Sequence, residues 1–250
     1  MLSKSKIKLI TSLLQKKFRD ETGLFIAEGG KLVFDLSSSF RCSILIATVN
    51  WWSENEKIIS DEYITVTEDE LKKISNQKSP QGVMAIFEKP SNDFTMGDLT
   101  NKLSLALDNV QDPGNLGTII RVADWFGIAN VFCSKNSADA YSPKTVQATM
   151  GALARVKIHY LDLPEFIKNC NNLLPIYGTF MDGENIYSKE LTESGIIVMG
   201  NEGNGISEEI EKLITNRLLI PSYPSNEPSS ESLNVSIATA LVCGEFRRRI

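Results

Sequence analysis

The sequence is poor in histidine and in long apolar runs, and each shortage argues against a class of protein. His159 is the only histidine in 250 residues and lies in the apolar stretch Val156–Leu161. This placement argues against a Ser-His-Asp triad and against a histidine-based metal site. No apolar run approaches the roughly 20 residues that span a bilayer. The basic, amphipathic N-terminus lacks the apolar core of a signal peptide. We therefore expect no membrane segment and no metal.

Paired cysteine is also missing. The four cysteines are widely separated and none forms a CxxC pair, which argues against a disulfide framework or a zinc site. A reducing, cytoplasmic location fits this usage best. The residues concerned are Cys42, Cys133, Cys170 and Cys243.

A basic net charge is the third absence. The formal net charge is −5 and the pI about 5.1, which argues against a generic nucleic-acid binder. Local basic surfaces are still possible, because lysines and Arg19 cluster within Lys4–Arg19 and three consecutive arginines stand near the C-terminus at Arg247–Arg249. Each cluster taken alone is better explained as a solvated face or a tail. With 250 residues, 42% of them hydrophobic, the chain can form one large or two modest domains.

The first 90 residues read as a small α/β unit. The apolar spacing of the first 20 residues predicts a helix, and Thr67 with Glu70 predicts a capping box that opens a helix over Thr67–Ser75. A strand and a helix are expected within Gly23–Ser39, and further strands over Ser43–Thr48 and Gly82–Glu88. Lys89–Asp98, rich in Pro, Ser, Asn and Gly, is the best linker candidate.

A second strand-helix alternation begins near residue 103 and predicts a mostly parallel sheet with helices on both faces, an α/β fold. Strands are expected at Leu103–Asp108, Asn130–Cys133, Arg155–Leu161, Ile176–Phe180, Ile196–Met199 and Leu218–Ile220. Helices are expected at Leu116–Phe126, Pro143–Leu153, Leu163–Leu173, Ser207–Thr215 and Leu233–Arg248.

The segment Leu107–Gly127 combines a strand end, an Asp-Pro-Gly-Asn turn and a helix. Arg121 lies off the apolar stripe of that helix. Open α/β sheets bind ligands just past the carboxyl ends of their strands, so this arginine is a candidate site residue. An ordinary surface arginine after a helix-starting turn explains this segment equally well.

A second segment, Gly195–Ser207, runs from a buried strand into a glycine-rich turn, Gly200–Gly205. Glycine lets the backbone approach a ligand closely and adopt positive φ. The order is G-x-x-G-x-G, and neither the dinucleotide fingerprint nor a P-loop lysine is present. A cofactor turn or a simple tight turn remain the two interpretations.

The third segment, Leu218–Arg249, reads as a strand ending at Ile220-Pro221, a polar loop and a C-terminal helix. Ser232 is expected to be the N-cap of that helix. The apolar stripe that follows is more typical of core or of an oligomer surface than of a cofactor site. It consists of Leu233, Ile237, Ala240 and Leu241.

Together the three segments resemble the SpoU (TrmH-like) branch of the SPOUT methyltransferases, whose pattern reads roughly DPxNxGxxxR, then GNExxG, then Ile-Pro followed by SLNVS. All three stand here in that order, over about residues 103–250. Phe25–Gly29 and Ser79–Val83 resemble, more weakly, the family's N-terminal substrate-binding domain. The matching positions are Asp112–Gly117 with Arg121, Gly200–Gly205, Ile220-Pro221 and Ser232–Ser236.

The resemblance implies a fold and a domain plan. Residues 1–92 would be an RNA substrate-binding domain of ribosomal L30e-like α/β fold, 93–101 a linker, and 102–250 a SPOUT methyltransferase domain. That domain would contain a deep trefoil knot, which composition could not reveal. The activity implied is S-adenosylmethionine-dependent methylation of a ribose 2′-OH in structured RNA by a cytoplasmic homodimer whose sites are completed across two subunits.

The resemblance also implies residue roles. Arg121 would act on the 2′-OH; because arginine has a pKa above 12, we expect it to stabilise the alkoxide or orient a phosphate, while the proton leaves by a relay. Asn115 would fix the arginine or the ribose, and Glu202 would hold Asn115 or Arg121. Ser232 and Asn234 would complete the shell around the nucleotide. S-adenosylmethionine would be held by Thr179, Gly200, Asn201, Gly203, Gly205, Ile220 and Leu233.

One departure and several alternatives accompany the resemblance. Ser222–Ser230 is longer than the usual family connection and is expected to face RNA or the dimer partner. A base methyltransferase, a non-catalytic RNA-binding or ribosome-assembly factor and a Rossmann oxidoreductase are weaker alternatives, the last lacking its fingerprint. Large-subunit (23S) ribosomal RNA is favoured over transfer RNA because of the extra N-terminal domain.

Overall fold

The computed structural model describes residues 2–55, 58–91, 93–224 and 232–248. The chain divides into two units, and it passes between them three times. Unit 1 comprises Met1–Ser91 and Asp139–Arg155, and unit 2 comprises Asn92–Ala138 and Val156–Ile250. No helix of the described residues is long and apolar enough to cross a membrane.

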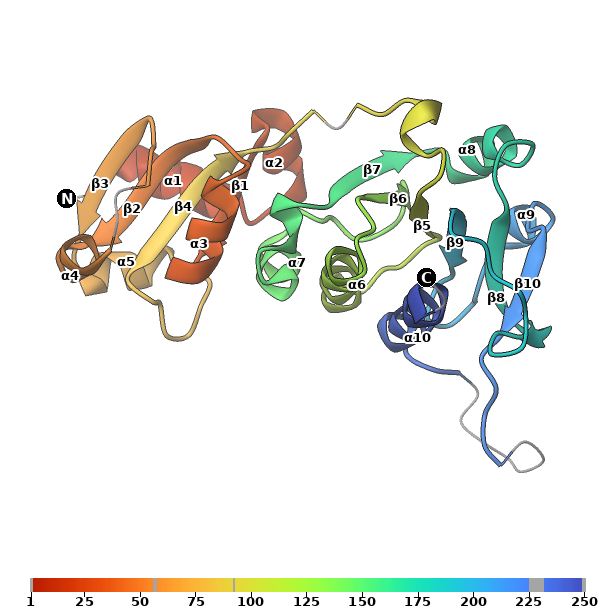
Figure 1. Cartoon of the computed structure of the whole chain (residues 1–250). Coiled ribbons are helices and arrows are strands. Elements are labelled where there is room, and N and C mark those ends of the chain that lie inside the picture. The colour runs from red at the N-terminus through yellow and green to blue at the C-terminus, as the bar shows by residue number, and fades with distance from the viewer. Residues whose placement is uncertain (1, 56–57, 92, 225–231, 249–250) are drawn as a thin grey trace. The chain divides into compact units, whose positions relative to one another are not determined.

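Unit 1 contains a four-stranded sheet in the order β1-β4-β2-β3 (Figure 1). β4 is antiparallel to β1 and β2, and β3 is parallel to β2. The strands are β1 (Leu24–Glu28), β2 (Cys42–Thr48), β3 (Glu62–Val66) and β4 (Val83–Glu88). The helices are α1 (Lys4–Ser12), α2 (Lys16–Thr22), α3 (Gly30–Ser37), α4 (Val49–Glu54), α5 (Glu68–Ile74), α7 (Pro143–Thr149) and the 3-10 turn η2 (Ala152–Ala154).

The sequence predicted some of the helices and strands of unit 1 correctly and missed others. The capping box is confirmed: the Thr67 hydroxyl accepts from the Glu70 backbone N–H, and the Glu70 carboxylate accepts from that of Thr67. The prediction of a single N-terminal helix is wrong. The first helix, α1, ends at Ser12 and is capped by the fully buried Leu13, and a second helix, α2, begins at Lys16. The sequence also missed α4 and β3. β3 is an edge strand with alternating exposure, so its apolar signal is weak.

Asp139–Arg155 groups with unit 1 through specific contacts. Arg19, almost fully buried, donates from Nε and Nη2 to one carboxylate oxygen of Asp139 at 2.9 and 2.7 Å, and from Nη1 to the Leu13 carbonyl. The Tyr141 ring lies 5.0 Å from that of Phe25. Removing one partner of such a buried pair leaves an uncompensated charge, at a cost of about 3–5 kcal/mol.

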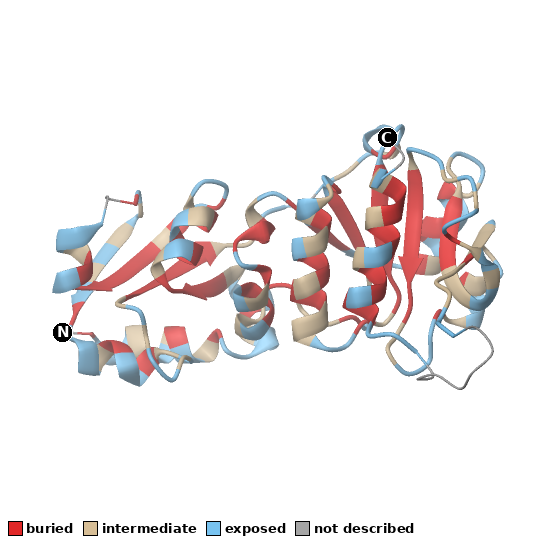
Figure 2. Ribbon diagram, turned by 60° about the horizontal axis from the view of Figure 1, so that its bottom comes forward, coloured by how far each residue is buried: buried red, intermediate tan, exposed pale blue. Residues whose placement is uncertain are grey.

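Unit 2 contains a six-stranded sheet in the order β10-β8-β9-β5-β6-β7, with every neighbouring pair parallel. Figure 2 shows the central strands of this sheet as buried and the helices as partly exposed, as a covered sheet requires. The strands are β5 (Leu103–Leu107), β6 (Asn130–Ser134), β7 (Lys157–Leu161), β8 (Ile176–Asn185), β9 (Gly195–Met199) and β10 (Asn216–Leu219). The helices are η1 (Met96–Asp98), α6 (Pro113–Trp125), α8 (Leu163–Cys170), α9 (Glu208–Glu211) and α10 (Val235–Arg248).

The predicted α/β class with a mostly parallel sheet is confirmed, and its helices form two layers. α8 and α9 share one apolar core with Phe132 of β6, while α6 packs against α10 (Figure 1). Four helices are shorter than predicted. The largest differences are in α7, which stops at Met150 and Gly151, both with positive φ, and in α9, which spans four residues; α8 ends at Cys170 and α10 begins at Val235.

Two sequence features find their place in the core of unit 2. His159 is buried, stacks on Phe132 and lies 3.1 Å from the Asn130 side-chain oxygen, so it is a structural strand residue. The linker candidate Lys89–Asp98 is only partly a connection, because Phe94 packs edge-on against Phe132.

Candidate active site at the carboxyl ends of the parallel strands

The order in which the chain adds strands to the sheet of unit 2 reverses between β5 and β9. From β5 the chain proceeds to β6 and β7 on one side, whereas β8 and β10 lie on the other side beyond β9. Because all six strands are parallel, the loops that follow β5, β9 and β10 open at the same edge. Such a switch point is where open α/β sheets bind ligands. All three segments singled out in the sequence begin there.

The loop after β5 delivers Asn115 to this edge. Asp112 is the N-cap of α6, and its carboxylate accepts from the Asn115 backbone N–H at 2.8 Å, with Pro113 in the first turn. This cap fixes where the helix begins. The Asn115 side chain donates from Nδ2 to Oε1 of Glu202, in the loop after β9, at 2.9 Å.

The loop after β10 adds Asn234 to the same group. Its Nδ2 donates to Oδ1 of Asn115 at 3.0 Å, so Asn115 is held from both ends of its amide. The Asn234 Oδ1 also accepts from the backbone N–H and hydroxyl of Ser236 at 2.9 and 2.6 Å. Asn234 is therefore the residue that caps α10. The expectation of Ser232 in that role is wrong, because Ser232 lies two residues too early.

Arg121 is not part of this hydrogen-bonded group. It lies exposed on α6, about 9 Å along the helix axis from Asn115 at 1.5 Å per residue. Among the described residues, no hydrogen bond or ion pair engages its guanidinium. Glu202 thus holds Asn115, and Arg121 remains available to a ligand at this edge.

The glycine-rich turn after β9 is rigidly built. A side chain at Gly200 would place its Cβ 2.2 Å from the Gly205 carbonyl carbon, so only glycine fits. Asn201 and Gly205 exchange two backbone hydrogen bonds. The Asn201 side chain donates to the Asn109 carbonyl at 2.8 Å and accepts from the backbone N–H groups of Gly203 and Asn204. The turn is therefore preorganised against the loop after β5.

Asp108 and Asn109 are residues of this site that the sequence reasoning missed. Asp108 is buried, and its carboxylate accepts from the Ser207 backbone N–H at 2.7 Å and from the Asn109 side chain at 3.0 Å. Asn109 adopts a positive φ, which turns the chain, and its backbone N–H donates to the Ser134 hydroxyl. An aspartate directly after a largely apolar, fully buried strand was the available signal.

The expected cofactor-binding residues lie along the same edge. Thr179 is half-buried in β8, Gly200 is buried after β9, and Ile220 follows β10. In the described part of the chain, the backbone groups of Ile220 and Leu233 form no backbone hydrogen bond, which leaves polar groups for a ligand. Most of Ser222–Ser230 lies outside the described residues, so the prediction for that loop stays untested.

An ion pair braces the strands beside Thr179. Arg217 of β10 donates from Nε to Asp182 of β8 at 3.2 Å, and its guanidinium lies 3.6 Å from the centre of the Phe180 ring. The hydrogen bond from Arg217 holds the pKa of the Asp182 carboxyl below its ordinary value. Arg217 also donates to Glu211 at 2.7 Å, which ties α9 to the same edge.

Comparison with known proteins agrees with this geometry. A model of the SpoU rRNA methylase family matches residues 102–244, and a model of the MRM3-like substrate binding domain matches residues 4–85. The chain is 29% identical to the 23S rRNA (guanosine(2553)-2'-O)-methyltransferase RlmP of Bacillus subtilis, over 97% of this chain and 96% of that protein.

Two solved structures are similar over the whole chain. A TrmH-family structure from Porphyromonas gingivalis is 42% identical, with a TM-score of 0.91 and full coverage of both chains. An AdoMet-bound rRNA methyltransferase from Sinorhizobium meliloti is 29% identical, with a TM-score of 0.86 over 100% of this chain and 97% of that one. The resemblance drawn from the three sequence segments is confirmed, and the chain belongs to the SpoU rRNA methylase family.

Proposed function

We propose that this chain methylates a ribose 2′-OH of large-subunit (23S) ribosomal RNA with S-adenosylmethionine as methyl donor. The observation that carries the proposal is the chain of side chains Glu202, Asn115 and Asn234, joined at 2.9 and 3.0 Å at the switch point of a SpoU-family sheet. Relatives named as 23S rRNA 2'-O-methyltransferases and an AdoMet-bound relative support the substrate and the donor.

The residues divide the work of this reaction. S-adenosylmethionine supplies a methyl group already activated by its sulfonium, so the protein's tasks are positioning and removal of a proton. Asn115 uses one Nδ2 hydrogen on Glu202 and keeps the second for the ribose or its phosphate. Arg121, always charged, stabilises the developing alkoxide or orients the adjacent phosphate. Ser232 and Asn234 close the polar shell, and the proton leaves by a relay.

The edge of the sheet suits the methyl donor. The open backbone groups of Ile220 and Leu233 are a donor and acceptor set suited to an adenine edge, and Thr179 lies on the neighbouring strand. The rigid turn that contains Gly200, Asn201, Gly203 and Gly205 would border the methionine part. We further propose that the segments after β9 and β10 form the trefoil knot typical of the family.

We assign RNA recognition to residues 1–92, a connection to residues 93–101 and catalysis to residues 102–250. The match of residues 4–85 to a substrate binding domain supports the first assignment. The exposed lysines Lys4, Lys8, Lys16 and Lys17 would give salt-dependent contact with phosphates. The partner is a structured RNA loop whose unpaired nucleotides are accessible. Four buried free thiols are compatible with a cytoplasmic location.

We also propose a homodimer that pairs through α6 and α10. These helices run parallel, because Asn234 bonds Asn115 near their first turns and Arg247 bonds the Phe126 carbonyl near their last. Both helices expose apolar side chains on unit 2, and such a patch marks an interaction surface. The exposed side chains are Trp125 (84%) of α6, Ile237 (53%) and Leu241 (41%) of α10, and Leu233 (48%) just before α10.

The test compares 2′-O-methyl sites in total RNA from cells with and without this gene. One 23S rRNA position is expected to lose its methyl group in the deletion and to regain it with the purified protein and S-adenosylmethionine. Nuclease P1 digestion with mass spectrometry separates ribose from base methylation. Loss of a methyl group from a transfer RNA instead would show that transfer RNA is the substrate. If no RNA changes and the protein does not bind S-adenosylmethionine, it is a non-catalytic factor.

A further inference from the structure

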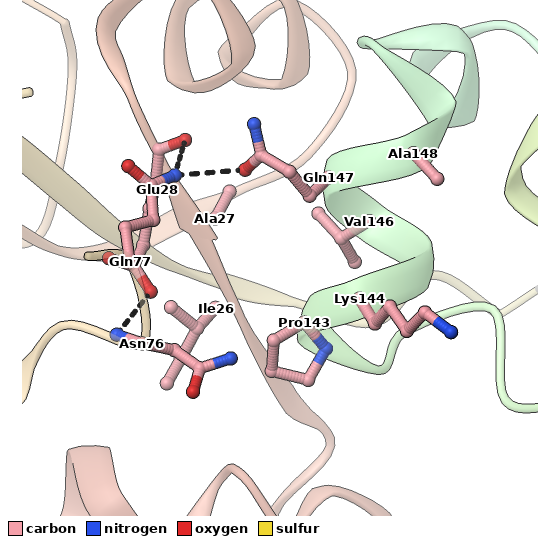
Figure 3. Close-up of a pocket in the computed structure, with 10 residues that line it drawn as sticks. All are labelled: Ile26, Ala27, Glu28, Asn76, Gln77, Pro143, Lys144, Val146, Gln147 and Ala148. Carbon is pink, nitrogen blue, oxygen red and sulfur yellow. Dashed lines mark hydrogen bonds between the residues drawn. The ribbon is translucent and has the colours of Figure 1, made fainter. Parts of the chain in front are cut away.

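Unit 1 contains a pocket of about 330 Å³ that the proposed reaction does not use. It lies between β1, the loop after α5 and helix α7, and Figure 3 shows the ten side chains around it. The volume falls within the range of small-ligand sites, about 300–1,000 Å³. Because α7 belongs to the second segment of unit 1, the pocket exists only where Asp139–Arg155 packs on the first segment.

One wall of the pocket is held in place by a buried carboxylate. Glu28, 7% exposed, accepts from the Asn76 backbone N–H at 3.0 Å and from the Ser75 hydroxyl. Its backbone carbonyl accepts from Nε2 of Gln77 at 3.4 Å. The loop is therefore fixed before any ligand arrives, which reduces the ordering cost of binding.

The same loop and α7 bring three side-chain amides to the pocket. Gln77 spends both Nε2 hydrogens, on the Glu28 carbonyl and on Oε1 of Gln147 at 3.1 Å. Among the described residues, no hydrogen bond engages Oε1 of Gln77, Nε2 of Gln147 or the side-chain amide of Asn76. The pocket thus offers uncharged donors and acceptors side by side.

Most of the remaining lining is apolar. Ile26 and Ala27 of β1 are buried, and Pro143 and Val146 of α7 face them across the pocket (Figure 3). Lys144 lies exposed at the rim. An apolar slot with amides at one side and a cation at its rim matches a base, its hydrogen-bonding edge and its phosphate.

We propose that this pocket binds the base of one unpaired nucleotide of the substrate RNA, separate from the nucleotide that is methylated. The proposal rests on the proposed function, because it takes the RNA as its partner. Asn76, Gln77 and Gln147 read the edge of the base, Pro143 and Ile26 contact its faces, and Lys144 approaches its phosphate.

The test measures binding of in vitro transcribed 23S rRNA to the full-length chain and to a double variant, Asn76→Leu with Gln147→Leu. Both changes remove amide groups from side chains at the surface while keeping their bulk. The dissociation constant for RNA is expected to rise at least about tenfold. The melting temperature and the affinity for S-adenosylmethionine are expected to stay unchanged. Asn50→Leu, an exposed amide of α4 that neither lines the pocket nor adjoins the proposed lysine contacts in the sequence, is the matched control and should leave RNA affinity at the wild-type value.

A second arm titrates AMP, GMP, CMP and UMP into both proteins by NMR. Weak, variant-sensitive binding of one nucleotide together with weakened RNA binding supports the proposal. Nucleotide binding lost by the variant while RNA binding is unchanged would assign the pocket to a free nucleotide and overturn it. A folded variant whose RNA affinity stays within twofold of wild type also overturns it. Failure of the proposed function is distinguishable, since wild-type protein would then bind RNA without methylating it.

Discussion

Asn115 donates its side-chain amide to Glu202, 87 residues later in the chain, at 2.9 Å. The pair joins the start of α6 to the glycine-rich turn after β9, which are brought together only because β5 and β9 are adjacent in the sheet. Asn234 then donates to the other end of the Asn115 amide. The side-chain amide of Asn115 cannot rotate without losing these hydrogen bonds, so its second Nδ2 hydrogen points in a fixed direction.

Arg121→Ala is expected to lower the rate of methyl transfer about 100- to 1,000-fold, the effect typical of removing a group that stabilises developing charge. Since Arg121 is exposed and has no partner among the described residues, the free energy of unfolding should change by less than about 0.5 kcal/mol. Single-turnover transfer of labelled methyl groups and urea unfolding measure the two quantities. Lys168→Ala, an exposed cation of α8, is the control. Near-normal turnover by the arginine variant would contradict the role.

Glu202→Ala and Asn115→Ala are expected to be non-additive, because each removes the same hydrogen bond. A double-mutant cycle on methyl-transfer rates should give a coupling free energy of about 0.5–3 kcal/mol. Glu202→Gln keeps an oxygen acceptor for Asn115 and should lose less activity than Glu202→Ala. Additive losses would mean that the two side chains act independently.

Asn234→Asp separates two roles of one side chain. The carboxylate can still accept from Ser236 at the start of α10, where a negative charge is favourable, so stability should be maintained or rise by a few tenths of a kcal/mol. It cannot donate to Asn115, so activity should fall about tenfold or more. Thermal unfolding and methyl-transfer rates measured on one preparation test this. Asn234→Ala, which loses both contacts, should reduce stability by about 1 kcal/mol as well.

Ile237→Glu is expected to convert the proposed dimer to monomer, because it places a charge in an apolar contact on the exposed face of α10. Sedimentation velocity at micromolar concentration would show the change in mass. Activity should fall with the dimer if each site is completed by two subunits. Glu209→Gln, exposed on α9 away from this face, should leave the mass unchanged. Wild-type protein that sediments as a monomer would refute the proposed dimer.

Buried thiols make stability fall at alkaline pH. Burial raises the pKa of Cys133 and Cys243 to about 12 and that of Cys170 to about 11, from an ordinary value of 9.0. The folded state keeps thiol protons that the unfolded state releases, so this stability is present below pH 9 and is lost between about pH 9 and pH 12. Urea unfolding from pH 8 to pH 10.5 should show the decline, and Cys133→Ala should make it shallower. Parallel profiles would contradict this origin.

The sequence alone was enough for those features that depend on neighbouring residues. Alternating apolar strands and helices predicted the α/β class, Thr67 with Glu70 predicted the start of α5, and the three motifs identified the family. Prediction from the sequence failed where the local pattern was weak or where tertiary contacts outweighed it. β3 lies at a sheet edge, α9 is one turn long, and the cap of α10 is Asn234 rather than Ser232.

Tertiary structure decided which of the candidate residues touch. Glu202 could have held Asn115 or Arg121, and strand order placed it on Asn115 while leaving Arg121 open. The same physics moved Asp139–Arg155 into unit 1, because the buried charge of Arg19 needs the Asp139 carboxylate, 120 residues away. Spacing along the chain specifies helices, strands and caps. Contacts between distant segments depend on strand order and on the requirement that buried polar groups find partners, and these emerge only when the whole chain is folded.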